Sequence, residues 1–489
     1  MDKKRFILKA AAAAVIAAFS VTPAIAEDVT ISGTVSESIP ETGGTPPDSV
    51  TITGAHVTAG DTESASPAVV IPASGSSLSI FGNTSVTISN SGIAPEDDDL
   101  LASSTFEGGT VIASSLTAVP AAQYWPTDYT GAVNGGAVDI ETGEGGTISI
   151  LRTDTSARNE SAYIYQYAAV MVNAKDADTD LTLDINKTRA ASRVTLQGGL
   201  YLAGPRTAAT LNLTGAGSSL AGGTDIRDGA SLVLNLEGDG SSISTDAETV
   251  SGGAPQLDIS GAGSTLTLTT GAGTAVWDEV RLKDGASGTI TANGALNNGV
   301  EVSGSASGPR TTATVTINGT AQGRSDASGN ATLDVTLAGD WDAGTPIGFS
   351  ASGTGSKATL TIESEQAGDP SKPASFRGLV SASGSGEVTV TNNGVMTGDL
   401  LSYDSDGQLP SISLTLNGTW TGNAIAGEDG RVMGISDETA VLYPGTADVT
   451  INKTGVWTTE GQFTVTDGDY SSILWYAPRT QVTGAGRSP

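Results

Sequence analysis

The chain of 489 residues contains no cysteine and a single histidine, His56. Without cysteine the fold has no disulfide bonds, and thiol catalysis and zinc–thiolate sites are excluded. A lipid anchor on an N-terminal cysteine is excluded for the same reason. A single histidine also excludes every site that needs two histidine ligands.

Aromatic residues make up 5% of the chain and charged residues 16%, and strong helix formers are scarce after the first twenty residues. Glycine is abundant, with 64 residues, and the hydrophobic content of 38% is too high for a purely disordered chain. Serine, threonine, alanine and valine dominate the remainder. This composition predicts many short strands joined by turns.

Basic residues are also few, since 23 of them face 53 acidic residues and leave a net charge of −30. No basic patch is present, so nucleic acid is not expected as a partner. A solvated acidic surface would keep an extended protein soluble. The alternative is that this surface collects cations.

Residues 1–26 have the pattern of a secretory signal peptide. Lys3, Lys4 and Arg5 supply the positive end, an apolar run follows over 6–19, and a small-x-small cleavage site precedes Glu27. The rest of the chain has no apolar run as long as a transmembrane helix. We therefore expect export through the inner membrane and no membrane span after cleavage.

Residues 411–422 show the local pattern on which the rest of the chain is built. Apolar residues alternate with Ser and Thr over 411–416, which is typical of a strand with one apolar face. Asn417 and Gly418 follow, and both tolerate a positive φ, so we expect the chain to turn there. Trp420 then begins a second extended segment.

Looser copies of this unit recur along the chain. We mark one apolar residue in each copy: Leu211, Leu234, Ile259, Val315, Leu333, Leu360, Val388, Leu414 and Val449. The markers predict a period of roughly 25 residues, which lies in the range of solenoids. One long gap, between Ile259 and Val315, is interpreted as two units, with the weak copy at 288–294 between them.

These features predict an all-β fold, a right-handed parallel β-helix (β-solenoid) that forms a single elongated domain. Propeller blades need longer repeats of about 40 residues. Residues 27–130 are expected to be irregular N-terminal coils or a cap with inserted loops. Residues 131–470 are expected to be the β-helix, and residues 471–489 a C-terminal tail.

The copies TLNGTWTGN (415–423) and VTINKTGVWTTEGQFTVTD (449–467) resemble the C-terminal coils of autotransporter passenger domains from Gram-negative bacteria. The short strands, Asn-Gly turns and tryptophans after an export signal are also similar to that family. The resemblance implies an adhesin-like, pertactin-style β-helix displayed outside the cell. It also implies a C-terminal translocator barrel, which needs many strands of about 10 residues. Only residues 471–489 remain after the last coil, so this sequence lacks the barrel.

Acidic residues alternate at Asp176, Asp178 and Asp180, and Asp184 follows. Alternating oxygen ligands suggest a calcium loop. Leu181 and Lys187, however, stand where an EF-hand has glycine and glutamate. The alternative is a solvated loop leading into a strand. Calcium is the one cofactor that the sequence suggests.

Three tyrosines, Tyr163, Tyr165 and Tyr167, would share one face of a strand. Facing outward they could stack on sugar rings, and the alternative is a row buried under a loop. Trp341, Trp420 and Trp457 each follow a strand. We expect them to form a packed apolar stack rather than a binding site.

An enzyme is the less favoured interpretation, because acidic residues are scattered and basic ones few. Asp184, Lys187, Arg189 and Arg193 are close in sequence, but no matching set occurs elsewhere. The favoured hypothesis is a non-enzymatic, exported adhesin-like protein. It would contact a host surface protein, a glycan or another copy, through a side surface or loops within 27–130. The alternatives are a β-helical polysaccharide lyase or hydrolase and a structural surface spacer. The expected location is the cell surface or the medium, or the periplasm if no barrel is supplied.

Overall fold

The structure is a computed structural model. It describes residues 28–35, 49–59, 76–82, 85–90, 136–142, 147–152, 170–173, 181–189, 191–197, 200–244, 256–404, 408–422, 424–428, 448–458, 464–467, 470–473 and 480–483. Within these residues every regular element is a strand and no helix occurs. None of them forms a helix long and apolar enough to cross a membrane.

The strands stack in parallel into three columns, which we call faces A, B and C. Face A contains the longest series of strands. In stacking order these are β1 (Asp28–Val35), β2 (Ser49–Ala59), β3 (Ser76–Gly82), β5 (Gly136–Thr142), β8 (Leu181–Ile185), β11 (Thr207–Leu213), β14 (Ser231–Leu236), β17 (Thr265–Thr270), β20 (Ser287–Ala292), β23 (Thr311–Ile317), β26 (Ala331–Leu337), β28 (Lys357–Ile362), β30 (Glu387–Asn392), β33 (Ser411–Leu416), β36 (Asp448–Lys453) and β40 (Thr480–Thr483).

Face B is built from shorter strands. After the end of β2 it contains β4 (Ser85–Asn90), β6 (Thr147–Arg152), β9 (Arg193–Gln197), β12 (Ser219–Ala221), β15 (Ser242–Ser244), β18 (Ala275–Val276), β21 (Ala295–Leu296), β24 (Thr320–Gln322), the first parts of β27 (Asp340–Ser352) and β29 (Ser375–Ser383), β31 (Val395–Thr397), β34 (Thr419–Thr421) and β37 (Val456–Thr458).

Face C completes each turn. It contains β7 (Val170–Asn173), β10 (Leu200–Ala203), β13 (Thr224–Arg227), β16 (Gln256–Ser260), β19 (Glu279–Lys283), β22 (Val300–Gly304), β25 (Ser325–Gly329), the second parts of β27 and β29, β32 (Leu400–Asp404) and β35 (Ala424–Glu428). Two further strands, β38 (Thr464–Asp467) and β39 (Tyr470–Ile473), form an antiparallel pair outside these columns.

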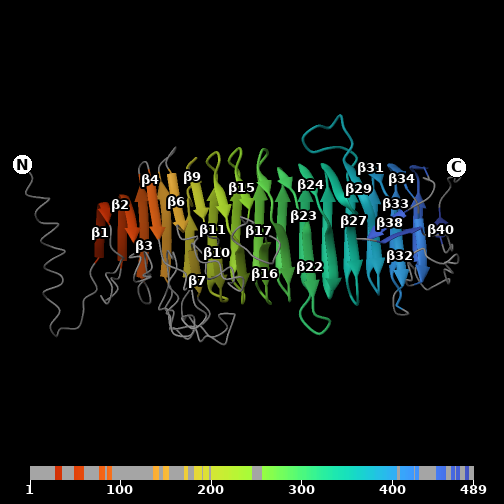
Figure 1. Cartoon of the computed structure of the whole chain (residues 1–489), viewed down its shortest axis with the longest axis horizontal. Coiled ribbons are helices and arrows are strands. Elements are labelled where there is room, and N and C mark those ends of the chain that lie inside the picture. Colours follow the sequence, from red (N-terminus) through yellow and green to blue (C-terminus); the bar gives the residue numbers. More distant parts are fainter. Residues whose placement is uncertain are drawn as a thin grey trace, which may run out of the picture.

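The chain visits face A, face B and face C in that order and then begins the next turn. From β11 to β35 this gives a parallel β-solenoid of about nine turns. Figure 1 shows the strands side by side along the long axis, from β1 at one end to β40 at the other. The predicted all-β solenoid is therefore confirmed.

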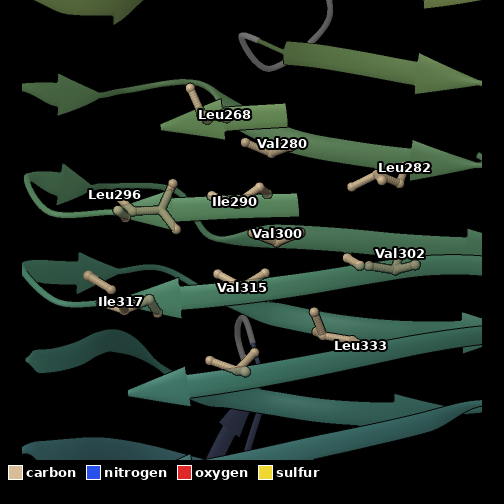
Figure 2. Close-up of a cluster of buried hydrophobic side chains, with 14 of the residues drawn as sticks. Leu268, Val280, Leu282, Ile290, Leu296, Val300, Val302, Val315, Ile317 and Leu333 are labelled. Carbon is tan, nitrogen blue, oxygen red and sulfur yellow. The ribbon is translucent and has the colours of Figure 1, made fainter. Parts of the chain in front are cut away.

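Apolar side chains from all three faces point into the solenoid and stack from turn to turn. On face A, Leu268, Ile290 and Val315 occupy equivalent positions of successive strands, and each is at most 1% exposed. Figure 2 shows such residues converging with Val280 and Leu296 from faces C and B. Each buried aliphatic side chain contributes roughly 1.5–3 kcal/mol, so this continuous core stabilises every turn through its neighbours.

Large aromatic residues fill the core along face B in the C-terminal half. In stacking order the buried side chains are Trp341, Phe376, Met396 and Trp420. The backbone of Trp457, in the next turn, pairs with that of Trp420. The Trp341 and Phe376 rings meet edge to face, with centroids 5.1 Å apart. Trp341 and Trp420 are fully buried, so these two tryptophans belong to the apolar core.

The Asn-Gly turns depend on close backbone stacking and not on a positive φ. Neither Asn417 nor Gly418 adopts a positive φ, so the reason expected from the sequence is wrong. A Cβ atom on Gly418 would lie only 2.1 Å from the carbonyl oxygen of Gly394 in the preceding turn. Glycine is required because the backbones of successive turns pass too close for any side chain.

The register corrects four of the repeat markers. Leu333, Val388 and Val449 lie on face A but two residues before the positions that continue from Val315, Leu360 and Leu414. Leu211 and Leu234 do occupy equivalent positions on face A, but Ile259 lies in β16 on face C. The strand of face A that follows β14 is β17, and β20 follows it at the weak copy expected at 288–294. The period near 25 residues survives as an average, because loops of different lengths connect the strands.

Candidate functional site

A row of charged side chains lies on face C of the described residues. We call it the charged stripe. It extends over β13, β16, β19, β22 and β25, with Arg324 directly before β25. Its residues are Asp225, Arg227, Asp258, Glu279, Arg281, Lys283, Glu301, Arg324 and Asp326. Five acidic and four basic side chains nearly cancel, in a chain whose net charge is −30. The stripe is thus a mixed-charge surface within an acidic protein.

The parallel register aligns the stripe. One row of equivalent positions contains Asp225, Asp258, Arg281, Glu301 and Asp326. Neighbouring strands of a sheet lie about 4.8 Å apart, so each charged group is within reach of the groups one turn above and below. The row ends at β27, where the residue equivalent to Asp326 is Ser350.

Arg281 is the centre of the stripe. Its Nε lies 2.7 Å from Oε2 of Glu279 on the same strand and 3.0 Å from Oε2 of Glu301 on the next turn. All three side chains are less than 30% exposed. Partly buried pairs are less screened than fully exposed ones, so this guanidinium group fixes both carboxylates in place.

The N-terminal half of the stripe contains two further ion pairs. The Nζ of Lys283 lies 3.1 Å from Oδ2 of Asp258, and Arg227 forms an ion pair with Asp225. The second carboxylate oxygen of Asp258, Oδ1, is buried and has no hydrogen-bond partner among the described residues. This oxygen is an acceptor that a water molecule or a bound ligand could satisfy.

Burial raises the pKa of two carboxyl groups in the stripe. For Asp225, loss of solvent contact raises the pKa, and Arg227 only partly offsets this effect. For Asp326, burial raises the pKa to about 6, with Arg324 opposing the shift and Glu301 reinforcing it. The C-terminal end of the stripe therefore changes its charge near neutral pH.

The calcium loop suggested by the sequence falls mostly outside the described residues. Asp176, Asp178 and Asp180 lie there, and only Asp184 is described. Asp184 is on β8, and its Oδ2 accepts a hydrogen bond from the Nζ of Lys187 at 2.8 Å. Its carboxylate already has a cationic partner, and the calcium site stays a prediction. Among the described residues, no group of three or more histidine or acidic side chains is placed to hold a metal ion.

Arg189 and Arg193, which are close to Asp184 and Lys187 in the sequence, contact different partners. The guanidinium group of Arg189 lies 2.9 Å from the carboxylate of Glu237, which is two turns further along the solenoid. Arg193 donates a hydrogen bond to the carbonyl oxygen of Gly217. These side chains do not converge on one point. The tyrosines 163, 165 and 167 lie outside the described residues, so the sugar-stacking row also stays a prediction.

The charged stripe itself was not expected from the sequence. Its strands are short and its charges alternate with buried apolar residues, as in Glu279, Arg281 and Lys283 around Val280 and Leu282. That alternation was the available signal. Recognising the stripe also required the register of five strands separated by loops of unequal length.

Comparison of the chain with protein-family models, with curated proteins and with solved structures gives no match. The fold alone defines the class, a parallel β-solenoid protein with repeat-like architecture.

Proposed function

We propose that the chain is an exported, adhesin-like attachment protein that contacts its partner through the side of the solenoid. The observation that carries this proposal is the charged stripe, in which five consecutive turns present fixed ionic groups on one face. Oriented carboxylates and guanidinium groups form strong, directional hydrogen bonds with polar partners. The continuous core keeps those groups in register over five turns.

The partner class that fits these groups is a glycan or a polar surface protein. Sugar hydroxyls both donate and accept hydrogen bonds, as the mixed carboxylate, guanidinium and ammonium groups of the stripe require. The near-neutral stripe also avoids the repulsion that the net charge of −30 would impose on an acidic partner. Export by the segment at 1–26 would place this surface outside the inner membrane, at the cell surface or in the medium.

Binding of the purified chain to intact cells and to immobilised glycans tests this proposal. We expect saturable binding that decreases when Arg281 and Lys283 are both changed to Gln. The matched control is Lys357→Gln, which removes an exposed cation from face A and should leave binding unchanged. Absence of saturable binding, or equal effects of both variants, would contradict the proposal. The first outcome is the one expected of a structural spacer.

One observation favours a second candidate, a polysaccharide hydrolase. Glu301 and Asp326 occupy equivalent positions on adjacent strands, and Asp326 has its pKa raised to about 6. Two neighbouring carboxyl groups, one of them with a raised pKa, are the pattern of a glycosidase acid and its partner. The Arg281–Glu301 ion pair opposes this role, because it engages the second carboxylate. Turnover of a polysaccharide panel that is lost in Asp326→Asn would establish the enzyme.

A further inference from the structure

Face A presents a surface of different chemistry, which we call the threonine face. It consists of two outward columns over β17, β20, β23, β26, β28, β30 and β33. The first column is Thr267, Thr289, Thr314, Asp334, Thr359, Thr389 and Ser413, and the second is Thr269, Thr291, Thr316, Thr336, Thr361, Thr391 and Thr415. Twelve of these fourteen positions are threonine.

Among the described residues, no hydrogen bond joins the hydroxyl group of any of these twelve threonines to another protein group. Thr267, Thr289, Thr314 and Thr389 are exposed, and the second column is partly exposed. A β-branched side chain has few rotamers, so the hydroxyl groups form a rigid array without an internal partner.

The spacing of this array is set by the backbone. Successive turns are about 4.8 Å apart, and alternate residues of one strand are about 6.7 Å apart. Hydrogen-bonded water oxygens lie about 2.75 Å apart, so tetrahedral geometry places second neighbours about 4.5 Å apart in ice. Along the perpendicular direction the lattice of water oxygens in ice repeats at intervals of about 7.3 Å. Both spacings of the threonine face are thus close to those of a tetrahedral water lattice.

The charge and the residue types of the threonine face indicate which kind of partner it binds. The face has one acidic residue among its fourteen positions, Asp334, in a chain of net charge −30. No aromatic residue occurs among them, which disfavours a sugar polymer bound by ring stacking. Each threonine offers water a hydroxyl donor and acceptor together with a methyl group that orders the surrounding water.

We propose that the threonine face binds ice, through a layer of ordered water molecules held by the hydroxyl and methyl groups. This binding is separate from the attachment that we assign to the charged stripe on face C. Each threonine contributes little to the affinity for ice. Because seven equivalent turns engage one crystal surface together, the affinity of the whole face far exceeds that of one turn. If the protein is attached to the outside of a cell, the threonine face would bind that cell to ice.

The test grows ice slowly from a dilute solution of the fluorescently labelled full chain and measures the fraction of protein incorporated. The chain should be enriched in ice, and the solution should show thermal hysteresis. The variant Thr289→Tyr/Thr314→Tyr should lose both effects, because the larger rings disrupt the array while tyrosine suits a strand. The matched control Thr320→Tyr, at an exposed position on face B, should behave like the original chain.

Circular dichroism spectra of all variants establish that each is folded. Exclusion of the folded chain from ice would overturn the proposal, as would equal incorporation of the face A and face B variants. If sedimentation instead showed a dimer that Thr314→Tyr dissociates, the face would bind a second copy and the ice proposal would fail. Changing Arg281 and Lys283 to Gln should leave incorporation unchanged, so failure here is distinguishable from failure of the attachment proposal.

Discussion

The indole N–H of Trp420 donates a hydrogen bond to the backbone carbonyl oxygen of Gly398 in the preceding turn, at 2.7 Å. Trp341 donates in the same way to Gly323, at 3.0 Å. In both cases the acceptor lies two residues after the strand partner of the tryptophan. The repeated geometry shows that each tryptophan fixes the corner between faces B and C of the turn beneath it.

Substitution of Trp420 is therefore expected to destabilise the C-terminal turns. Trp420→Ala should lower the free energy of unfolding by about 3–5 kcal/mol, since it opens a cavity in the core. Trp420→Phe keeps an aromatic ring but leaves the Gly398 carbonyl without its donor, so a loss of about 1–3 kcal/mol is expected. Urea unfolding followed by circular dichroism measures both.

The control for these variants is Trp277→Phe, because Trp277 is 53% exposed. A change within about 0.5 kcal/mol is expected there. Equal effects at Trp420 and Trp277 would contradict the structural role of the buried stack.

Gly418→Ala should destabilise the chain although Gly418 has an ordinary φ. The new Cβ would lie 2.1 Å from the carbonyl oxygen of Gly394, so successive turns must move apart. We expect a loss of about 1–3 kcal/mol, as for other overpacked sites. Gly368→Ala is the matched control, because a Cβ there meets nothing within 4 Å. Thermal unfolding that is unchanged by Gly418→Ala would refute the close stacking of the turns.

Asp326 makes stability depend on pH in a direction that can be measured. Its pKa is raised from 3.8 to about 6 in the folded protein. Between these values the unfolded chain is ionised while the folded one keeps its proton, so the stability from this group decreases as pH rises from about 4 to about 6. Above pH 6 the loss is constant. The difference of about two pKa units corresponds to at most about 3 kcal/mol.

The variant Asp326→Asn removes this titration. Its free energy of unfolding, measured in urea from pH 4 to pH 7, should decrease less over that range than that of the original chain. Parallel pH profiles for the two proteins would show that Asp326 is ionised normally. The comparison also needs no assumption about the other carboxyl groups, which are common to both proteins.

The sequence predicted the fold best on face A. Strands such as Ser411–Leu416 contain three apolar residues in strict alternation, and a strand of this length is long enough to reveal the period of two. On face B, strands such as Ala275–Val276 contain two residues, too few for any pattern. Ile259 resembles the markers of face A although it lies on face C, because the strands of both faces have the same alternation and only their pairing separates them.

The candidate site was less accessible from the sequence than the fold. Arg281 and Glu301 are twenty residues apart in the chain, yet their side chains form an ion pair at 3.0 Å. That proximity follows from the length of one turn, which varies with the loops. The raised pKa of Asp326 likewise follows from burial, which no spacing of residues reveals.

Simultaneous measurement of binding and turnover tests the proposed attachment function most directly. The full chain is incubated with a panel of immobilised polysaccharides, and both retained protein and newly formed reducing ends are quantified. The proposed function predicts saturable retention without new reducing ends. Retention should fall when Arg281 and Lys283 are changed to Gln and stay constant in Lys357→Gln. Reducing ends that increase with protein concentration and disappear in Asp326→Asn, or no saturable retention at all, would contradict it.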